Sequence, residues 1–484
     1  QANPDQSKHL ETANVRILQF SVDCVNLRAE SYALDSRIPI TRCGTPQDDA
    51  MRRDFTINAL FYNVSEGKVE DFTCCGLADL KIGVISTPLD PFVTFRDDPL
   101  RVLRGIRFAS RYNFKLAKEL IDAASDPEIR NALLLKVSKE RVWKELEGML
   151  GLTGCSIARP ALALTMIHNM SLFETIFHVE SSLEKCSTVL KNARSSGNFS
   201  DVESCIASWK ADVHTSEWCH MLMYLAGSYS GIMTEELEFA ALSLNSTLTV
   251  PSEHEILMEY VYSSKTRCEL KQSINIETLM NACCNANALI APGVLLLSSF
   301  LFKLYAVEYL GKKSLPLSTF LLRDSLKVDN DLIKTVENMH YAASHFNIFS
   351  LKGCQREEVG MVLRTCKSHW RSAILVACAS NFQSGILCNC SSYEFTEQDL
   401  SIIRRFVDLS EAIQAMQLED SWNEKPLLGG NDLVSDCKIP RGPLIGKATE
   451  AQIRWRLRNP ASSREDCREF ILQWCESQQG ENSK

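Results

Sequence analysis

Residues 96–112 read RDDPLRVLRGIRFASRY, and they mark the point where the sequence turns from β-type to helical patterning. Apolar residues recur in this stretch at three- and four-residue spacings, as on one face of an amphipathic helix. Asp98 and Pro99 fit the cap and first position of such a helix, where an acid also complements the helix dipole. The stretch therefore predicts a helix from residue 98 onward. Its predicted core face comprises Val102, Leu103, Ile106 and Ala109.

The basic residues of this stretch gather on one side of the predicted helix. At the rotation of an α-helix they share an arc of about 120°. No acid occurs between Asp98 and Glu119, although a solvated face usually mixes charges of both signs. Arginine binds phosphate bidentately, so the arc predicts an anion-binding surface, with an ordinary basic helix as the alternative. The arc consists of Arg101, Arg104, Arg107, Arg111 and, if the helix extends that far, Lys115 and Lys118.

Asp98 and Arg101 lie one helical turn apart, so an acceptor and a donor can face the same ligand. Cytosine and adenine each offer an exocyclic amine beside an acceptor ring nitrogen on the Watson–Crick edge. Uracil and guanine present the reverse pattern, and a mismatch at a polar site discriminates strongly. The pair therefore predicts selection of C and A over U and G. Simple capping of the helix is the alternative for the acid.

The totals of the chain limit the class of protein. Its 484 residues suffice for several domains, and 45% hydrophobic with 23% charged residues is typical of soluble globular proteins. The sequence has no long uninterrupted apolar run of the kind that spans a membrane. A net charge of −8 argues against a globally basic nucleic-acid binder but permits a local basic surface. Nineteen cysteines without CxxC spacing favour a reduced intracellular compartment over zinc sites or disulfides.

The pattern of apolar residues predicts three parts of different structure. The first part is β-rich: residues 16–32 predict a strand interrupted by Asp23, residues 57–63 and 68–73 predict two strands around a turn, and residues 81–87 predict a short β segment. Helical periodicity then continues to about residue 420 without a fixed repeat. The last part is punctuated by Gly and Pro before an amphipathic helix, and it predicts a small helical module.

Several ordered segments together resemble the tRNA nucleotidyltransferase (CCA-adding enzyme) family, in the class shared with bacterial poly(A) polymerases. These segments are MRRDFTINALFYN at 51–63, DDPLRVLRGIRF at 97–108 and VSKERVWKELEGML at 137–150. The opening, KHLETANVRILQFSVDCVNLRAESYALDSRIP at 8–39, is similar to the eukaryotic branch. The ending, KPLLGGNDLVSDCKIPRGPLIGKATEAQIRWRLRNP at 425–460, is similar to the family's C-terminal module.

The resemblance implies an α+β fold with a remnant of a polymerase-β-like nucleotidyltransferase head, which has a mixed sheet, and an elongated all-α neck, body and tail. The implied domains are the incomplete head at 1–95, neck helices with the nucleotide-reading motif at 96–150, a helical body at 151–423, and a tail that contacts tRNA at 424–484. The implied activity is template-independent transfer of CMP and AMP from CTP and ATP to the tRNA 3′ end.

The resemblance also assigns roles to residues. Asp98 and Arg101 read the base edge, with Asp97 in place of the more usual glutamate. The other implied nucleotide-binding residues are Arg53, Asp54, Arg104 and Arg107. The implied supporting residues behind them are Asn58, Glu140 and Arg141, where the last two brace the base-reading helix or form an ordinary surface pair. Asp71, Phe72 and Gly76 fall where the family has a flexible connector between head and neck.

Nucleotidyl transfer of this kind usually needs two metal ions, so the resemblance implies Mg²⁺. Family members bind the metal through a DxD pair in an N-terminal GGxxRD…DxD segment, which this sequence lacks. Asp23 can supply the third carboxylate of such a site, as catalytic residue and metal ligand, or it is a solvated acid at a strand end. The sequence therefore predicts that the chain, as it stands, lacks the main metal ligands and is inactive.

Three alternatives remain open from the sequence. A poly(A) polymerase shares the head and neck motifs, a non-catalytic tRNA-binding protein would need no metal site, and a helical scaffold would use only residues 160–420. The expected partners are the tRNA 3′ end and nucleoside triphosphates, with no membrane. Candidate tRNA contacts in the tail are Arg454, Arg456 and Arg458. The compartment inside the cell is not distinguished.

Overall fold

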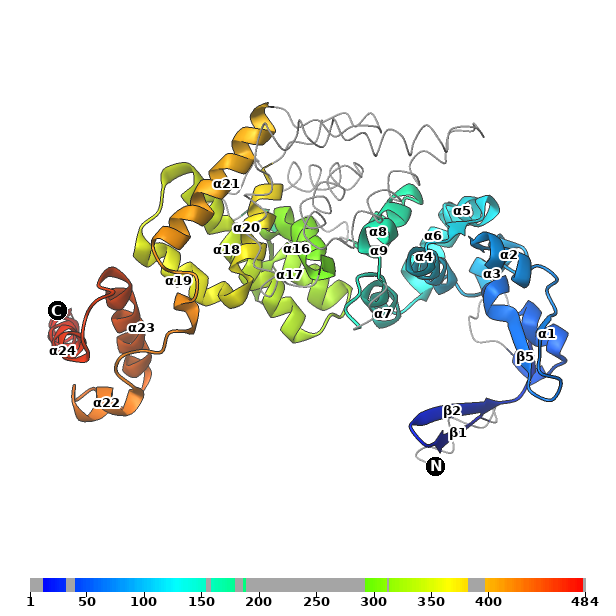
Figure 1. The fold of residues 1–484 in the computed structure, drawn as a ribbon, viewed down its shortest axis with the longest axis horizontal. Helices are drawn as coiled ribbons and strands as arrows, with labels where there is room; N and C mark the ends of the chain where they lie inside the picture. Colours follow the sequence, from blue (N-terminus) through cyan, green and yellow to red (C-terminus); the bar gives the residue numbers. More distant parts are fainter. Residues whose placement is uncertain are drawn as a thin grey trace.

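The computed structural model describes residues 12–31, 40–153, 158–178, 186–188, 292–310, 313–381 and 397–481. The described part of the chain forms an elongated arch, with the head at one end and the tail at the other (Figure 1). A mixed α/β head is followed by a helical neck, body and tail, so the predicted fold class is confirmed. Within the described residues, no helix is both long and apolar enough to cross a membrane.

The head begins with a hairpin, β1 (Thr12–Ile17) and β2 (Phe20–Val25), in which Val15 lies opposite Val22. The single strand predicted within residues 16–32 is therefore wrong. The chain reverses at Leu18, whose φ is 55°, and the sequence there offers none of the Gly or Asn residues that usually mark such a turn. After the hairpin, β3 (Arg28–Ser31) pairs antiparallel with β4 (Ile40–Cys43).

A second hairpin, β5 (Leu60–Asn63) with β6 (Lys68–Asp71), confirms the two strands predicted around the turn. Gly67 adopts φ 65° in that turn, a conformation that glycine tolerates without steric cost. The first of these strands starts later than predicted, because a 3-10 helix, η2 (Thr56–Ala59), precedes it. Before η2, a short helix α1 (Pro46–Met51) carries a capping box at Thr45.

The β segment predicted at 81–87 is mostly replaced by a helix, α2 (Gly76–Ile82). Gly83 ends this helix with φ 73°, and only β7 (Val84–Ile85) remains as strand. β7 pairs in parallel with β8 (Lys115–Leu116), which joins head to neck. The neck helices are α3 (Pro91–Asp97), α4 (Leu100–Tyr112), α5 (Lys118–Ala124), α6 (Pro127–Lys136) and α7 (Lys139–Met149).

Helix α4 buries the apolar face that the sequence predicts, with Val102, Leu103, Ile106 and Ala109 all at 0% exposure. It begins at Leu100, two residues later than predicted, with the Asp98 carboxylate accepting a hydrogen bond from the Leu100 amide at 3.3 Å. It ends at Tyr112 because Asn113 takes a left-handed conformation, with φ 60°. Lys115 and Lys118 therefore lie outside α4, and the basic arc stops at Arg111.

In its described residues the body is mainly helical, and there it also contains a three-stranded antiparallel sheet in the order β11-β10-β9. The helical periodicity predicted across residues 189–291 lies outside the described residues. The described body elements are α8 (Pro160–Asn169), α9 (Phe173–Ile176), β9 (Cys186–Thr188), α16 (Pro292–Tyr305), β10 (Val307–Leu310), β11 (Ser314–Pro316), α17 (Leu317–Phe320), η4 (Leu321–Ser325), α18 (Asn330–Lys352), α19 (Arg356–Cys366), η5 (Lys367–His369), α20 (Trp370–Ala379), α21 (Glu397–Ala415) and η6 (Ser421–Asn423). The tail helices are α22 (Gly430–Ser435), α23 (Pro443–Arg458) and α24 (Arg464–Glu481).

One hydrophobic core runs continuously from the head through the neck into the body, from Phe55 to Leu418, and it includes Leu457 of the tail. The tail has a small second core of its own, built around Leu433 and Ile471. Cysteines such as Cys366 and Cys378 are buried in the large core as free thiols, which fits their predicted use as small apolar residues.

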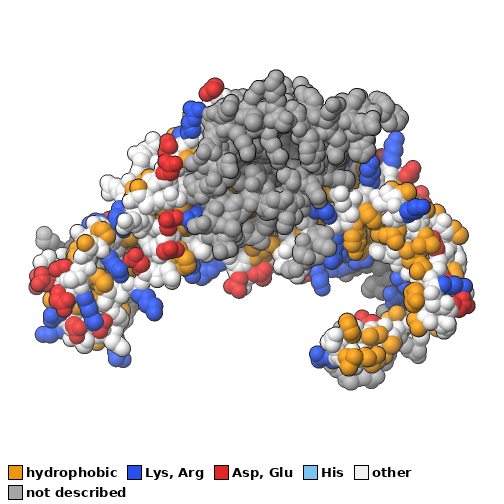
Figure 2. All heavy atoms as spheres, viewed as in Figure 1, with side chains coloured by type: hydrophobic (Ala, Val, Ile, Leu, Met, Phe, Trp, Pro, Cys, Tyr) orange, Lys and Arg blue, Asp and Glu red, His pale blue; other side chains and the backbone are white. Residues whose placement is uncertain are grey.

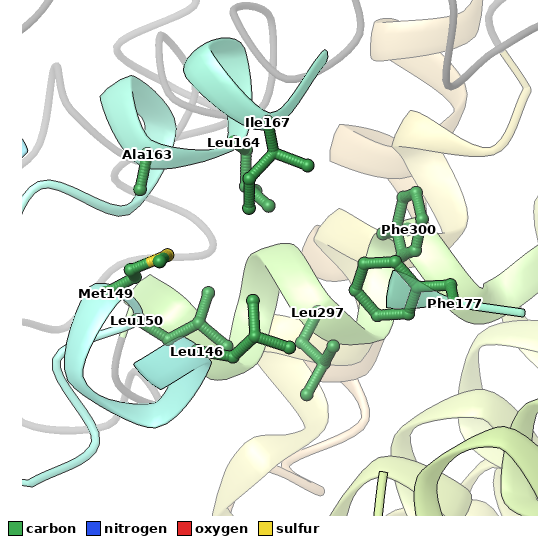
Figure 3. A pocket seen from close by; sticks show the side chains of 9 residues that line it. All are labelled: Leu146, Met149, Leu150, Ala163, Leu164, Ile167, Phe177, Leu297 and Phe300. Atoms are coloured by element: carbon green, nitrogen blue, oxygen red, sulfur yellow. The ribbon is translucent and has the colours of Figure 1, made fainter. Parts of the chain in front are cut away.

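The neck meets the body at a seam of apolar side chains from α7, α8 and α16 (Figure 3). The space between them is about 10 Å³, which is at most the room of one water molecule. The gap is a dry packing defect, because its lining offers water no polar partner. Its lining residues are Leu146, Met149, Leu150, Ala163, Leu164, Ile167, Phe177, Leu297 and Phe300.

Candidate nucleotide-binding site

Asp98 and Arg101, the pair predicted to read the base, lie at the start of α4, and each is held by a different element. The Asp98 carboxylate accepts a hydrogen bond from Arg141 Nη2 of α7 at 3.1 Å. Arg101 Nη2 donates to the backbone carbonyl of Arg52 in the head at 2.9 Å. Both residues are half-buried, so each is fixed in place and still reachable from solvent. The base-edge acceptor and donor therefore lie one turn apart, braced by the neck and the head respectively.

The two residues expected to brace this helix behave differently. Arg141 makes the contact with Asp98, and its side chain is 41% exposed. Glu140 is exposed and forms no ion pair or side-chain hydrogen bond with any residue that the structure describes. At this end of α7, Arg141 is therefore the residue that holds Asp98 in place.

Asp54 connects the head to the neck. Its carboxylate accepts from Arg104 Nε at 2.8 Å and from Arg104 Nη2 at 2.7 Å. Its other oxygen accepts from the Asn58 amide at 3.1 Å and from the Phe55 backbone at 2.9 Å. Asp54 is only 9% exposed. These bonds therefore replace the hydrogen bonds to water that its carboxylate loses on burial. Asn58 thus supports Asp54, and Asp54 fixes Arg104.

Glu145 of α7 is a charged residue of the site that sequence reasoning missed. It is 8% exposed, its Oε2 accepts from Arg107 Nε at 2.5 Å, and its Oε1 lies 4.0 Å from Arg104 Nη1. The signal was present, because Glu145 is four residues after Arg141 and so lies on the same face of α7. Gly148, one turn further, lets Arg107 pass, since a Cβ there would sit 2.9 Å from Arg107 Cδ.

The basic arc is therefore partly neutralised, by acids from other elements. Asp54 of the head pairs with Arg104, and Glu145 of α7 pairs with Arg107. Helix α4 itself contains no acid, as its sequence shows, but acids of other elements lie beside the arc. The aromatic ring of Phe108 adds to the arrangement, since the Arg107 and Arg104 guanidinium carbons lie 4.4 and 5.6 Å from its centroid.

Arg53 is positioned by Asp49 of α1, a second residue that sequence reasoning missed. Arg53 Nε and Nη2 donate to Asp49 Oδ2 at 3.0 and 2.9 Å, and Arg52 binds the other oxygen of the same carboxylate. Burial alone would raise the pKa of Asp49, but hydrogen bonds from Arg52 and Arg53 outweigh it and lower the pKa below its ordinary value. Asp49 thus stays ionised and orders both arginines.

Asp71 lies in an ordered turn between β6 and α2. Its carboxylate accepts from the Thr73 hydroxyl at 2.7 Å and from the Leu77 amide at 3.0 Å. Burial opposes ionisation, but these hydrogen bonds prevail and lower the pKa of Asp71. The expected flexible connector therefore has a defined, hydrogen-bonded conformation. Phe72 packs edge-on against Phe61, with ring centroids 5.6 Å apart.

Asp23 lies on the projecting hairpin, where it is exposed and accepts a hydrogen bond from Asn14 at 2.6 Å. Among the described residues, no group of three or more His, Cys, Asp or Glu side chains could hold a metal ion. The described residues therefore do not fit a Mg²⁺ site on their own. The rest of the hairpin exposes apolar side chains (Figure 2), such as Phe20 at 61%.

The three tail arginines suggested for tRNA are engaged with acids of the protein. Arg454 and Arg458 both pair with Glu357 of α19, and Arg456 pairs with Glu424. These ion pairs lower the pKa of Glu357, chiefly through Arg458. The arginines thus fasten α23 to the body. Other Lys and Arg side chains gather on the concave side of the arch beside the neck (Figure 2).

Comparisons with known proteins identify the family to which the chain is similar. Residues 2–86 match the family model described as the poly A polymerase head domain. The chain is 30% identical over 480 residues to the mitochondrial CCA tRNA nucleotidyltransferase of Candida glabrata, covering 97% of this chain and 78% of the relative. It is 31% identical over 466 residues to the enzyme of that name from Saccharomyces cerevisiae, covering 95% and 75%.

A solved structure shares the fold. It is the Bacillus stearothermophilus CCA-adding enzyme in complex with CTP, which matches with a TM-score of 0.50 and covers 98% of this chain and 84% of that one. The sequence identity is 14%, so the likeness speaks for the fold alone.

Proposed function

We propose that this chain, which belongs to the CCA tRNA nucleotidyltransferase family, transfers CMP and AMP from CTP and ATP to the 3′ end of tRNA without a template. The observation that supports this most is the acceptor–donor pair at the start of α4. Asp98 is held by Arg141, and Arg101 is held by the Arg52 carbonyl. Similarity to CCA tRNA nucleotidyltransferases over 97% of the chain supports the same activity.

In this proposal, Asp98 and Arg101 select the base. A carboxylate has about four lone-pair sites, so Asp98 retains acceptor capacity beyond its bonds to Arg141 and Leu100. It accepts a hydrogen bond from the exocyclic amine of cytosine or adenine. Arg101 has further N–H donors beside the one that holds the Arg52 carbonyl, and it donates to the neighbouring ring nitrogen. Uracil and guanine leave both groups mispaired.

Arg53, Arg104 and Arg107 bind the sugar and phosphates in this proposal. Each is held by a buried acid, namely Asp49, Asp54 and Glu145 respectively, so little side-chain freedom is lost when a triphosphate binds. The paired acids also prevent three neighbouring guanidiniums from repelling each other before the nucleotide arrives. Asn58 supports Asp54 through its amide.

Mg²⁺ is the metal expected for the reaction, and it would lower the barrier for attack by the tRNA 3′ hydroxyl. Asp23 is the acid of this chain that we propose as a ligand and catalytic carboxylate. Its hydrogen bond to Asn14 holds it on the hairpin. The described residues do not form a complete metal site, so we assign no step to the ion.

The proposed domain organisation is a head at 1–95, a neck at 96–150, a body at 151–423 and a tail at 424–484. The tRNA partner would lie along the concave side of this arch, where Lys and Arg side chains gather (Figure 2). Two relatives carry "mitochondrial" in their names, and we propose an intracellular location without choosing a compartment.

Poly(A) addition is the second candidate, because the matching family model is described as a poly A polymerase head domain. That match covers residues 2–86 only. Similarity to the CCA enzymes extends through the body and tail, which favours addition to tRNA.

The proposal is tested by incubating the full-length protein with one nucleotide at a time and measuring which nucleotides it adds to RNA. With Mg²⁺, CTP and a tRNA that ends at its discriminator base, we expect addition of two cytidines, and of one adenosine when ATP follows. An unstructured RNA of similar length is the control substrate. Repeated adenosine addition to both RNAs, without cytidine addition to tRNA, would establish a poly(A) polymerase instead.

A further inference from the structure

A small cavity lies where the tail meets the body, away from the nucleotide site. Its walls are α19 of the body, α23 of the tail, and the segment that joins them after η6. Its volume is about 50 Å³. One water molecule needs roughly 10–15 Å³ of such space, so the cavity has room for a few groups of that size. A single tetrahedral oxyanion is of this scale.

The lining of this cavity is strongly basic. Four cationic side chains contribute to it, with Glu424 as the one carboxylate among its lining residues. Glu424 pairs with Arg456, with Oε2 and Nη2 3.3 Å apart. Four cations therefore face a single acid in a space of a few water molecules. The cationic residues are Arg356, Arg364, Lys425 and Arg456.

Two of the arginines have a structural role that explains part of this charge. Arg364 Nη1 donates to the carbonyls of Ser421 and Glu424 at 2.9 and 3.0 Å, and Arg456 Nη1 donates to the Lys425 carbonyl at 2.9 Å. Both arginines thus hold the connecting segment. Burial lowers the pKa of Arg364, and the nearby Arg456 lowers it further against the effect of Glu424. Both arginines line the same cavity, so their positive charges share this small space.

Arg356 has no such structural explanation. Its Nε is buried and lacks a hydrogen-bond partner in the part of the chain that the structure describes. Arg356 begins α19, whose N-cap residue Gln355 makes no side-chain capping bond. A buried donor without a partner is uncommon in folded proteins. The orphaned N–H, in a cavity with an excess of positive charge, indicates a ligand that accepts hydrogen bonds and carries negative charge.

We propose that this cavity binds one phosphate group, through Arg356, Arg364 and Arg456. Arginine donors match phosphate oxygens in geometry, and charge-assisted bonds to phosphate are stronger than neutral ones. The phosphate belongs either to an RNA backbone or to a free inorganic ion. Bound there, it bridges α19 and α23 and strengthens the junction of body and tail.

Binding of inorganic phosphate to the purified full chain tests the proposal. Titration calorimetry at constant ionic strength, with chloride as the exchanged anion, should detect phosphate binding that depends on Arg356, apart from binding at the proposed nucleotide site. In Arg356→Gln, loss of a charge-assisted donor should weaken the affinity by about tenfold or more. Arg404→Gln, which removes an exposed cation on α21, should leave it unchanged. Arg356→Lys, which keeps the charge without Nε–H, should weaken binding by less than Arg356→Gln.

A second measurement distinguishes a phosphate of tRNA from a free phosphate ion. It determines the affinity for tRNA at several salt concentrations. If the phosphate is part of tRNA, Arg356→Gln lowers the affinity and the salt slope, by roughly 0.7–0.9 for one lost phosphate contact. If tRNA binding is unchanged but inorganic phosphate binds, the ligand is the free ion. The proposal is overturned if the wild type binds no phosphate or if Arg356→Gln binds it as tightly.

Discussion

At the scale of single residues, two arginines of α4 are each held by an acid from another segment, Arg104 by Asp54 and Arg107 by Glu145. The sequence identifies the arginines because they recur on one face of α4. It does not identify their partners, since Asp54 and Glu145 lie 50 and 38 positions away from Arg104 and Arg107. Such pairing depends on how the head, α4 and α7 pack together, and no local pattern reports it.

Asp98→Ala is expected to damage base selection and rate together. Loss of the acceptor removes a hydrogen bond to the exocyclic amine, so we expect kcat/KM for CTP and ATP to fall by about 100-fold or more, with weaker discrimination against UTP. Steady-state kinetics with each nucleotide measure this effect. Asp122→Ala, an exposed acid on α5, is the control. An Asp98→Ala enzyme with unchanged C and A selectivity would contradict the assigned role.

Glu145→Gln is expected to act on nucleotide binding through Arg107 while leaving base choice intact. The amide keeps the shape but loses the charge that holds Arg107, so we expect a higher KM for both CTP and ATP at similar selectivity. The free energy of unfolding should fall by about 2 kcal/mol, because the substitution weakens a buried, charge-assisted hydrogen bond. Glu140→Gln, exposed on the same helix, should change neither quantity. Equal effects of the two substitutions would refute the positioning role of Glu145.

At the scale of elements, local patterns predict the interior of a helix better than its ends. Helix α4 was placed correctly because its apolar face is continuous, and all four predicted core residues are buried. The helix begins at Leu100, two residues later than predicted, because Asp98 and Pro99 lie outside it and Pro99 is the N-cap. The β1–β2 hairpin was missed since Leu18 takes the left-handed turn without a glycine. The base-reading pair stays a prediction, and its two members could be proposed together because they are only three positions apart in the sequence.

The contact of α19 with α23 depends on Gly360. A Cβ at this position would lie 2.4 Å from Leu457 Cδ2, so Gly360→Ala should push the two helices apart and destabilise the junction by about 1–3 kcal/mol. Gly446→Ala on α23 is the matched control, because a Cβ there meets no atom within 4 Å. Removing that helical glycine should instead stabilise by up to about 1 kcal/mol. Thermal unfolding compares the two variants, and stabilisation by both would contradict the close packing.

At the scale of the whole molecule, a core shared by neck and body carries the site at one end, and ion pairs dock the tail at the other. The length of the chain predicts several domains, the periodicity of its apolar residues predicts a long helical part, and the elongated arch agrees (Figure 1). The three-stranded sheet of the body was not predicted, because its strands are only three or four residues long and β9 lies far from β10 and β11 in the sequence. The role of Arg454 and Arg458 was not apparent from sequence either, since their partner Glu357 lies about a hundred positions away.

Stability of the body is expected to fall in mild acid because of His340. This histidine is fully buried between α16 and α18, and burial lowers its pKa to about 4, despite its hydrogen bond to the Ser298 carbonyl. The unfolded chain binds the proton below about pH 6.5, while the folded chain resists until about pH 4. Stability should therefore drop by about 2 kcal/mol between pH 7 and pH 5 on account of this group.

Urea unfolding at several pH values measures this dependence. The variant His340→Gln should be less stable at pH 7 but should lose less stability between pH 7 and pH 5 than the wild type. An equal loss in both proteins would assign the acid sensitivity to other groups.

The central claim, that Asp98 and Arg101 direct the addition of C and A to tRNA, is tested most directly by sequencing the product. The full-length protein is supplied with all four nucleoside triphosphates in equal amounts and a tRNA that ends at its discriminator base. We expect the added 3′ ends to read CCA, with U and G rare. Ends with U or G in proportion to their supply, or runs of A alone, would contradict the account.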